Sequence, residues 1–225
     1  MGKDSSGKGP SSRRERRGRA ISESTTERLS LYLRCLTQLE RAGVETISSK
    51  ALADRFQLNS ALIRKDLTYF GAFGMRGVGY KVRELRAHIV QILGLDRELR
   101  VAIIGAGNLG QALADYGGFN SEGCRIVALF DVSPEKVGTY SRGGVPVHHV
   151  NLLEQILQKE QVNIVALAVP SGEGQELLDR VAACGVRAVL NFVPDRLLPI
   201  EGLFIRNVDL KIQLEGLSFL LAHSR

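Results

Sequence analysis

Apolar residues recur at helical spacing where the ordered part of the chain is expected to begin. We predict a helix from about Ser24 to Gly43, where glycine ends the pattern. Four leucines lie on one face of this helix: Leu29, Leu33, Leu36 and Leu39. A single apolar face predicts packing on a core along one side and exposure to solvent along the other.

Two shorter helical patterns follow, and only a tight turn separates them. The first begins at a cap provided by Ser48 or Ser49 and ends at Phe56. The second begins at Ser60, as its cap, and runs to about Tyr69. Six apolar side chains are available for a shared core: Ala51, Leu52, Phe56, Leu62, Ile63 and Leu67. This arrangement is the helix-turn-helix pattern, whose second helix reads DNA.

A glycine-rich run, DLTYFGAFGMRGVGY at 66–80, follows the expected recognition helix directly. A winged helix has a hairpin at this place, and glycines would let its tip bring Arg76 into a narrow groove. The aromatic side chains Phe70, Phe73 and Tyr80 are expected to pack the hairpin on the helices. An ordinary structural hairpin and a nucleotide-binding loop are the alternatives, and the loop is disfavoured because no strand precedes the run. We expect DNA contacts from seven residues: Lys50, Ser60, Arg64, Lys65, Tyr69, Arg76 and Gly77.

After residue 97 the pattern changes to buried strands that alternate with helices. The segment 99–119, LRVAIIGAGNLGQALADYGGF, reads as a strand, a glycine turn and a helix. Gly105, Gly107 and Gly110 form G-x-G-x-x-G in the context typical of a dinucleotide-binding turn. Further strands are expected within 125–132, 144–150, 162–170, 186–194 and 203–210. Alternation of this kind predicts an α/β fold with a mostly parallel, right-handed sheet.

The second expected strand ends in Asp131, 26 residues after Gly105. Its carboxylate would accept hydrogen bonds from the ribose hydroxyls of the adenosine and would repel a 2′-phosphate. No arginine follows in DVSPE, so the sequence favours NAD(H) over NADP(H). A Rossmann-like domain without a dinucleotide is the alternative. The expected cofactor contacts are Gly105, Ala106, Gly107, Asn108, Leu109, Gly110, Asp131, Val169, Pro170, Asn191 and Phe192.

The charge distribution points to an anionic partner for the N-terminal part. Residues 1–97 carry 19 Lys or Arg against ten acids, whereas residues 98–225 carry eleven against fourteen. Nucleic acid would therefore meet the N-terminal half. The stretch 1–22 is Ser/Gly/Arg-rich without apolar periodicity, and we expect a disordered basic tail there.

Several classes of function lack support in the sequence. His88, His148, His149 and His223 are poorly placed to serve as the general acid of a dehydrogenase, so no catalytic residue is predicted. No Cys/His cluster has metal-ligand spacing. The three cysteines are widely spaced, which favours a reducing, cytoplasmic compartment, and no apolar run has the length of a membrane helix. A nucleotide-binding assembly protein that does not bind DNA stays an alternative.

The motifs together resemble the Rex family of redox-sensing transcriptional repressors. The resemblance runs from about Arg28 to Leu221. Its motifs are YLR (32–34), IRKDLTYFGAFGMRGVGY (63–80), GAGNLGQALADYGGF (105–119), GGVPVHHV (143–150), NFVP (191–194) and NVDL (207–210). One departure is Gly117, where the family usually has proline.

The resemblance implies a homodimeric bacterial repressor that binds an inverted-repeat operator and is released by NADH. It also implies a switch formed by Arg34, Tyr116 and Asp209, and a terminal helix that is exchanged between subunits. That helix carries the apolar stripe Leu214, Leu217, Leu220 and Leu221, although docking on its own sheet is an alternative. NAD⁺ would compete with NADH, whose neutral ring would prefer an apolar pocket formed by Pro170, Phe192 and Val193.

These interpretations divide the chain into five parts. A tail at 1–22 precedes a winged-helix DNA-binding domain at 23–83 and a linker helix at 84–97. A Rossmann NAD(H)-binding domain at 98–210 and a dimerisation helix at 211–225 follow.

Overall fold

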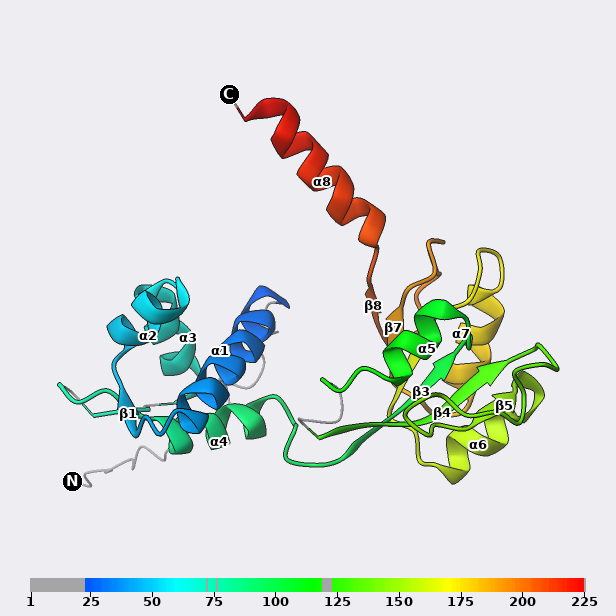
Figure 1. The fold of residues 1–225 in the computed structure, drawn as a ribbon, viewed down its shortest axis with the longest axis horizontal. Helices are drawn as coiled ribbons and strands as arrows, with labels where there is room; N and C mark the ends of the chain where they lie inside the picture. The colour runs from blue at the N-terminus through cyan, green and yellow to red at the C-terminus, as the bar shows by residue number, and fades with distance from the viewer. Residues whose placement is uncertain (1–22, 72, 76, 119–122, 225) are drawn as a thin grey trace, which may run out of the picture. The chain divides into compact units, whose positions relative to one another are not determined.

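The computed structural model describes residues 23–71, 73–75, 77–118 and 123–224, and the chain forms two compact units (Figure 1). The units are Met1–Gly94 and Leu95–Arg225. The predicted basic tail and Arg76, the predicted tip of the wing, lie outside the described residues.

The N-terminal unit is built on α1, as its leucine pattern predicts. The unit contains α1 (Glu23–Arg41), β1 (Thr46–Ile47), α2 (Ser49–Phe56), α3 (Ser60–Phe70), β2 (Tyr80–Lys81) and α4 (Val82–Ile92). The four leucines of α1 are each at most 1% exposed. Ile63 and Leu67 of α3 are also buried, and so are Leu85 and Ile89 of α4. The apolar faces of these helices therefore form one core.

The caps of α2 and α3 show how far local sequence signals reach. Ser48 caps α2, since its hydroxyl accepts from the backbone N–H of Ala51 at 3.0 Å. Asn59, not Ser60, caps α3, because its Oδ1 accepts from the N–H groups of both Ala61 and Leu62. Both residue types are good caps, and the position of the turn decided between them.

Two of the six predicted core residues of the helix-turn-helix are exposed. Ala51 is exposed, and Leu62 retains 40% of its accessible surface, whereas Leu52, Ile63 and Leu67 are buried. Ala53, which the sequence did not single out, is buried on α2. The angle between two short helices sets which positions face inward, and the spacing along each helix does not specify that angle.

The glycine-rich run forms the predicted hairpin. Met75 and Gly79 exchange backbone hydrogen bonds of 2.9 and 3.0 Å, and β2 pairs antiparallel with β1. Gly79 has φ of +101°, and a Cβ there would lie 2.5 Å from the carbonyl oxygen of Ile47, so only glycine fits. The half-buried ring of Phe73 lies 4.9 Å from the ring of His88 on α4, which attaches the hairpin to the helices.

Helix α4 is part of the N-terminal unit, although the sequence pattern predicts a linker at this place. It packs along α1, its residues Val82, Leu85 and Ile89 are buried, and Arg86 donates to Thr37 of α1 at 3.1 Å. The N-terminal unit accordingly extends to Gly94.

The C-terminal unit contains the predicted parallel sheet. Its elements are β3 (Leu99–Ile104), α5 (Asn108–Ala114), β4 (Cys124–Asp131), β5 (Val147–His149), η2 (Val150–Leu152), α6 (Leu153–Lys159), β6 (Ile164–Leu167), α7 (Gly174–Ala183), β7 (Ala188–Asn191), β8 (Phe204–Asn207) and α8 (Leu210–His223). The strand order is β5-β4-β3-β6-β7-β8, and all neighbours are parallel. The chain leaves β3 toward β4 on one side and reaches β6 on the other, which places a topological switch point beside β3.

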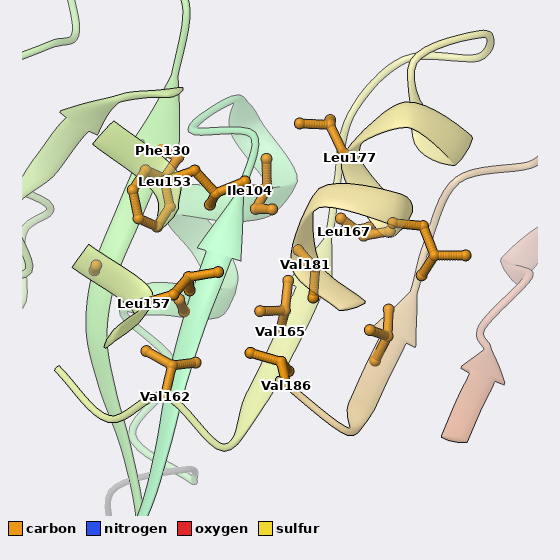
Figure 2. Packing of buried hydrophobic residues seen from close by; sticks show 14 of the residues in the cluster. Ile104, Phe130, Leu153, Leu157, Val162, Val165, Leu167, Leu177, Val181 and Val186 are labelled. Atoms are coloured by element: carbon orange, nitrogen blue, oxygen red, sulfur yellow. The ribbon is translucent and has the colours of Figure 1, made fainter. Parts of the chain in front are cut away.

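Helices cover both faces of this sheet. On one face, α6 and α7 pack on the strands, with Leu153, Leu157 and Val181 against Val165 and Leu167 (Figure 2). On the other face, α5 packs through Ala114 in a second cluster. This two-sided burial explains why β3 and β6 are almost continuously apolar.

Helix α8 follows β8 at the end of the chain (Figure 1). Its large apolar side chains are exposed. Asp209 caps it, since Oδ1 accepts from the N–H groups of Lys211 and Ile212 at 2.8 and 3.2 Å. None of its described side chains is buried, and Leu214, Leu217 and Leu221 are 67%, 58% and 79% exposed. In the single chain, α8 does not dock on its own sheet.

Candidate functional site

The glycine turn between β3 and α5 has the geometry that its motif predicts. Gly105 has φ of +102°, and a Cβ there would collide with the carbonyl of Ala168 after β6. A Cβ on Gly110 would collide with the carbonyl of Gly105, so glycine allows the helix to approach the turn. A Cβ on Gly107 would meet no atom within 4 Å, which leaves open space above the N-terminus of α5.

A cleft of about 580 Å³ opens beside this turn at the carboxyl ends of β3, β4 and β6. This is the place where ligands bind in open α/β sheets. Seven of the eleven predicted cofactor contacts line it: Gly105, Gly107, Asn108, Leu109, Asp131, Val169 and Pro170. The four others are Ala106, Gly110, Asn191 and Phe192, and they do not line it.

Asp131 is held in a defined orientation at the end of β4. Its Oδ1 accepts from the N–H of Ser133 at 2.9 Å, and its Oδ2 accepts from the N–H of Ala106 at 2.9 Å. The ammonium of Lys136 donates to Oδ2 at 3.0 Å. Burial alone would raise the pKa of Asp131, but the hydrogen bonds from Ser133, Lys136 and Ala106 outweigh burial, and the pKa is lowered. The carboxylate is therefore ionised at neutral pH.

Charged residues that the sequence analysis did not single out also line the cleft. Lys136, Glu173, Glu176 and Arg180 are among them. Arg180 is engaged by Glu154 through two hydrogen bonds of 2.7 and 3.0 Å, and this carboxylate raises the pKa of Arg180. Lys136 follows directly after DVSPE, so its position in the chain was a usable signal.

Asn191 and Phe192 make contacts outside the lining of the cleft. The side chain of Asn191 is 1% exposed, accepts from the N–H of Val193 at 3.0 Å and donates to Oδ1 of Asn207 at 2.9 Å. Phe192 packs at the edge of the cluster formed with α5. In this structure, Asn191 ties the end of β7 to the end of β8, just before α8.

The predicted recognition helix presents its polar residues to solvent. Arg64, Lys65 and Tyr69 of α3 are exposed, as is Lys50 on α2, whereas Ser60 is half-buried. The guanidinium of Arg64 donates to the hydroxyl of Ser49 at 3.2 Å. Arg64, Ser48 and Ser49 line a groove of about 360 Å³ together with hairpin residues that include Gly77. The structure thus gathers one helix, one helix start and the hairpin on a single face.

A buried ionic network holds α3 on α1, and the sequence analysis missed it. Asp66 is 4% exposed and accepts from Nε and Nη2 of Arg28 at 2.6 and 2.8 Å and from the Tyr32 hydroxyl at 3.0 Å. The Arg28 guanidinium is the largest cause of the lowered pKa of Asp66. Burial, followed by the bond to Asp66, raises the pKa of Tyr32 to about 12. A signal existed, since Asp66 interrupts an otherwise apolar face of α3.

The three predicted switch residues lie in both units. Arg34 is exposed on α1, in the N-terminal unit. Tyr116 follows α5 and is 57% exposed, and Asp209 is the half-buried cap of α8.

Comparisons with known proteins agree with this two-part construction. A family model described as "Putative DNA-binding protein N-terminus" matches residues 20–68, and one described as "CoA binding domain" matches residues 96–195. The redox-sensing transcriptional repressor Rex of Streptomyces coelicolor is 47% identical over 203 residues, or 90% of this chain and 78% of that protein. Rex of Desulfitobacterium hafniense is 45% identical over 199 residues, or 88% of this chain and 94% of that protein.

Solved structures show the same similarity. RSP, a Rex-family repressor, in complex with β-NAD⁺ and operator DNA has a TM-score of 0.86 at 35% identity, covering 92% of this chain and 94% of that one. RSP in complex with β-NADH has a TM-score of 0.80 at 33% identity, covering 92% of this chain and 96% of that one.

Fold and site together define a transcription regulator in which a winged-helix DNA-binding domain precedes a Rossmann domain. The chain belongs to the Rex family of redox-sensing transcriptional repressors. This membership confirms the resemblance stated above and the prediction that the protein is a repressor and not an enzyme. No helix in the described part of the chain is long and apolar enough to cross a membrane.

Proposed function

We propose that this protein represses transcription by binding an inverted-repeat operator as a homodimer, and that NADH releases it from the DNA. The single observation that carries the proposal is the joining of two sites in one chain. An exposed basic recognition helix lies in one unit, and a cleft with a glycine turn and an ionised carboxylate lies in the other.

In the DNA-binding unit, Arg64 and Lys65 would reach base edges or phosphates in the major groove. Lys50, Ser60, Tyr69 and the hairpin residue Gly77 are proposed as further contacts, with Arg76 entering the minor groove. The hydrogen bond from Arg64 to Ser49 supports this arrangement, because it orients the guanidinium toward the groove beside the hairpin.

In the cleft, the pyrophosphate of the dinucleotide would lie over Gly107 and the N-terminus of α5. Asp131 would accept hydrogen bonds from the ribose hydroxyls of the adenosine. The open space above Gly107 supports this position. The nicotinamide would extend toward Val169 and Pro170, where β6 ends. An apolar environment there disfavours the cationic ring of NAD⁺ more than the neutral ring of NADH.

The dimer would be formed through α8. Its exposed leucines are a large apolar surface on one helix, and a partner chain is the natural cover for such a surface. Exchange of α8 between subunits is part of this proposal, as is the switch formed by Arg34, Tyr116 and Asp209. A guanidinium, a phenol and a carboxylate form a charge-assisted network that can exist in one domain arrangement and break in another.

Release of DNA by NADH requires that the affinities for NADH and for DNA be coupled. NADH must bind the DNA-incompetent arrangement more tightly, and DNA must weaken NADH binding by the same factor. Such coupling is typically about 1–3 kcal/mol. A repressor of bacterial genes works where the chromosome lies, so we propose a cytoplasmic location.

The test is fluorescence anisotropy of a labelled AT-rich inverted-repeat duplex, titrated with protein and then with NADH or NAD⁺. We expect binding that NADH reverses at concentrations where NAD⁺ does not. Equal affinity of the protein for the two forms would contradict the proposal, and so would salt-sensitive DNA binding that neither form changes.

A further inference from the structure

Lys136 is the one cation that contacts the ribose-binding carboxylate among the described residues. Its Nζ lies 3.0 Å from Oδ2 of Asp131, and both residues line the cleft. The side chain of Asp131 is 10% exposed, whereas that of Lys136 is 42% exposed. A backbone turn after β4 places this lysine, since the N–H of Lys136 donates to the carbonyl of Ser133 at 3.1 Å. The ammonium is therefore held at the rim of the cleft, beside the carboxylate.

This contact changes how the cleft discriminates between dinucleotides. A lone carboxylate at the end of the second strand repels a 2′-phosphate and thus selects NAD(H). Here the charge of Asp131 is balanced by Lys136 at hydrogen-bond distance. Since Oδ2 faces both Lys136 and the Ala106 N–H, a group bound to the adenosine ribose at Asp131 would lie within reach of the ammonium.

The other charges around the cleft do not offer an equivalent contact. Arg180 is committed to Glu154 and also donates to the carbonyl of Val150 at 3.0 Å. Glu173 and Glu176 are acidic and would oppose a phosphate. Among the described residues that line the cleft, Lys136 is thus the cation that pairs with Asp131 and with no other charged group.

We propose that Lys136 is a specificity-determining residue that moderates the rejection of NADPH, and that it becomes the contact for a 2′-phosphate once the charge of Asp131 is removed. The inference rests on the proposed function, because it assumes that NADH occupies this cleft. Its ligand class is a dinucleotide with a phosphate on the adenosine ribose. A phosphate beside an unbalanced ammonium gains a charge-assisted hydrogen bond.

The experiment is a double-mutant cycle with the full-length protein. Affinities for NADH and NADPH are measured for the wild type, Asp131→Asn, Lys136→Met and the double variant. Calorimetry is used because the chain contains no tryptophan whose fluorescence could report on binding. Asn keeps the shape and one acceptor oxygen of Asp131, and Met keeps the length of Lys136. Lys159→Met, at the end of α6 and outside the cleft, controls for the change in net charge.

We expect Asp131→Asn to shift the preference toward NADPH by about tenfold or more, the size of one charge-assisted hydrogen bond. Adding Lys136→Met should abolish that gain, and Lys136→Met alone should weaken NADPH more than NADH. Equal NADPH binding by Asp131→Asn and the double variant would overturn the inference, as would an unchanged NADPH/NADH ratio in Lys136→Met. The proposed function fails separately if the wild type binds no NADH.

Discussion

Two carboxylates, one in each unit, show how the same chemistry serves different ends. Asp66 is buried and satisfied by Arg28 and Tyr32, both of which come from another helix. Asp131 lies at a cleft and is held by two backbone N–H groups and by a half-exposed lysine. Both have a lowered pKa, but only Asp131 lies where a ligand can reach it.

The two ion pairs connect parts of the chain that are separated by very different numbers of residues. The pair at Asp66 joins two helices that are far apart in sequence, so it positions α3, the proposed recognition helix, on α1. The pair at Asp131 joins the end of β4 to the turn that follows it, five positions along the chain, so it contributes little to the global fold. The two backbone N–H groups orient the carboxylate of Asp131, whereas the half-exposed Lys136 can be exchanged for a ligand group at the rim of the cleft.

The largest expected effect comes from removing the charge of Asp66. Asp66→Asn leaves Arg28 with a weakened partner in a part-buried position, and we expect a loss of about 2–3 kcal/mol from the free energy of unfolding of the N-terminal unit. Operator binding should weaken and NADH affinity should not. Circular dichroism during urea unfolding and the two binding assays measure this, with the exposed Asp54→Asn on α2 as the control.

The pH dependence of the same site has a defined sign. The pKa of Asp66 in the folded protein lies below its ordinary value of 3.8, so the stabilisation is present above that pH and is lost as the pH falls through the folded pKa. Asp66→Asn should remove this part of the acid sensitivity. An identical acid profile in the variant would contradict the assigned role.

Asp131→Ala tests the other side of the comparison. We expect NADH affinity to fall by about 2 kcal/mol, since a charged acceptor of the ribose hydroxyls is lost. The free energy of unfolding should change by less than that, and the operator should still bind but no longer be released by NADH. Glu135→Gln in the same loop is the matched control. A normal NADH response in Asp131→Ala would show that the ribose binds elsewhere.

Arg64→Ala tests a direct contact with DNA, whereas Asp66→Asn tests the positioning of the helix that makes this contact. The side chain is exposed, so stability should be unchanged, while operator affinity should fall by about 1–3 kcal/mol. If Arg64 meets a phosphate instead, the slope of log affinity against log salt should decrease by about one. A parallel loss of NADH affinity would indicate misfolding.

The smallest effect is expected at Asp209, which belongs to neither pair. Asp209→Ala should cost α8 about 1 kcal/mol by removing its cap, whereas Asp209→Asn should preserve the helix. Dimerisation, measured by sedimentation, should therefore weaken in Asp209→Ala and stay unchanged in Asp209→Asn. Release of DNA by NADH should be impaired in both variants, because both lose the negative charge of Asp209. A normal response in Asp209→Asn would exclude Asp209 from the switch.

Local sequence patterns predicted most of the helices and strands of this protein. Leucine spacing predicted α1, alternation predicted the parallel sheet, and the glycine spacing predicted the turn at Gly105, because each depends on backbone preferences over a few residues. The winged-helix and Rossmann classes followed from the order of these patterns.

Tertiary structure decided what those patterns leave open. The crossing of α2 and α3 exposed Ala51 and Leu62, and the packing of α3 on α1 paired Asp66 with Arg28 across 38 positions. It also paired Asn191 at the end of β7 with Asn207 at the end of β8. The partner of a side chain depends on which segments meet in space, and periodicity along one segment contains no information about that meeting.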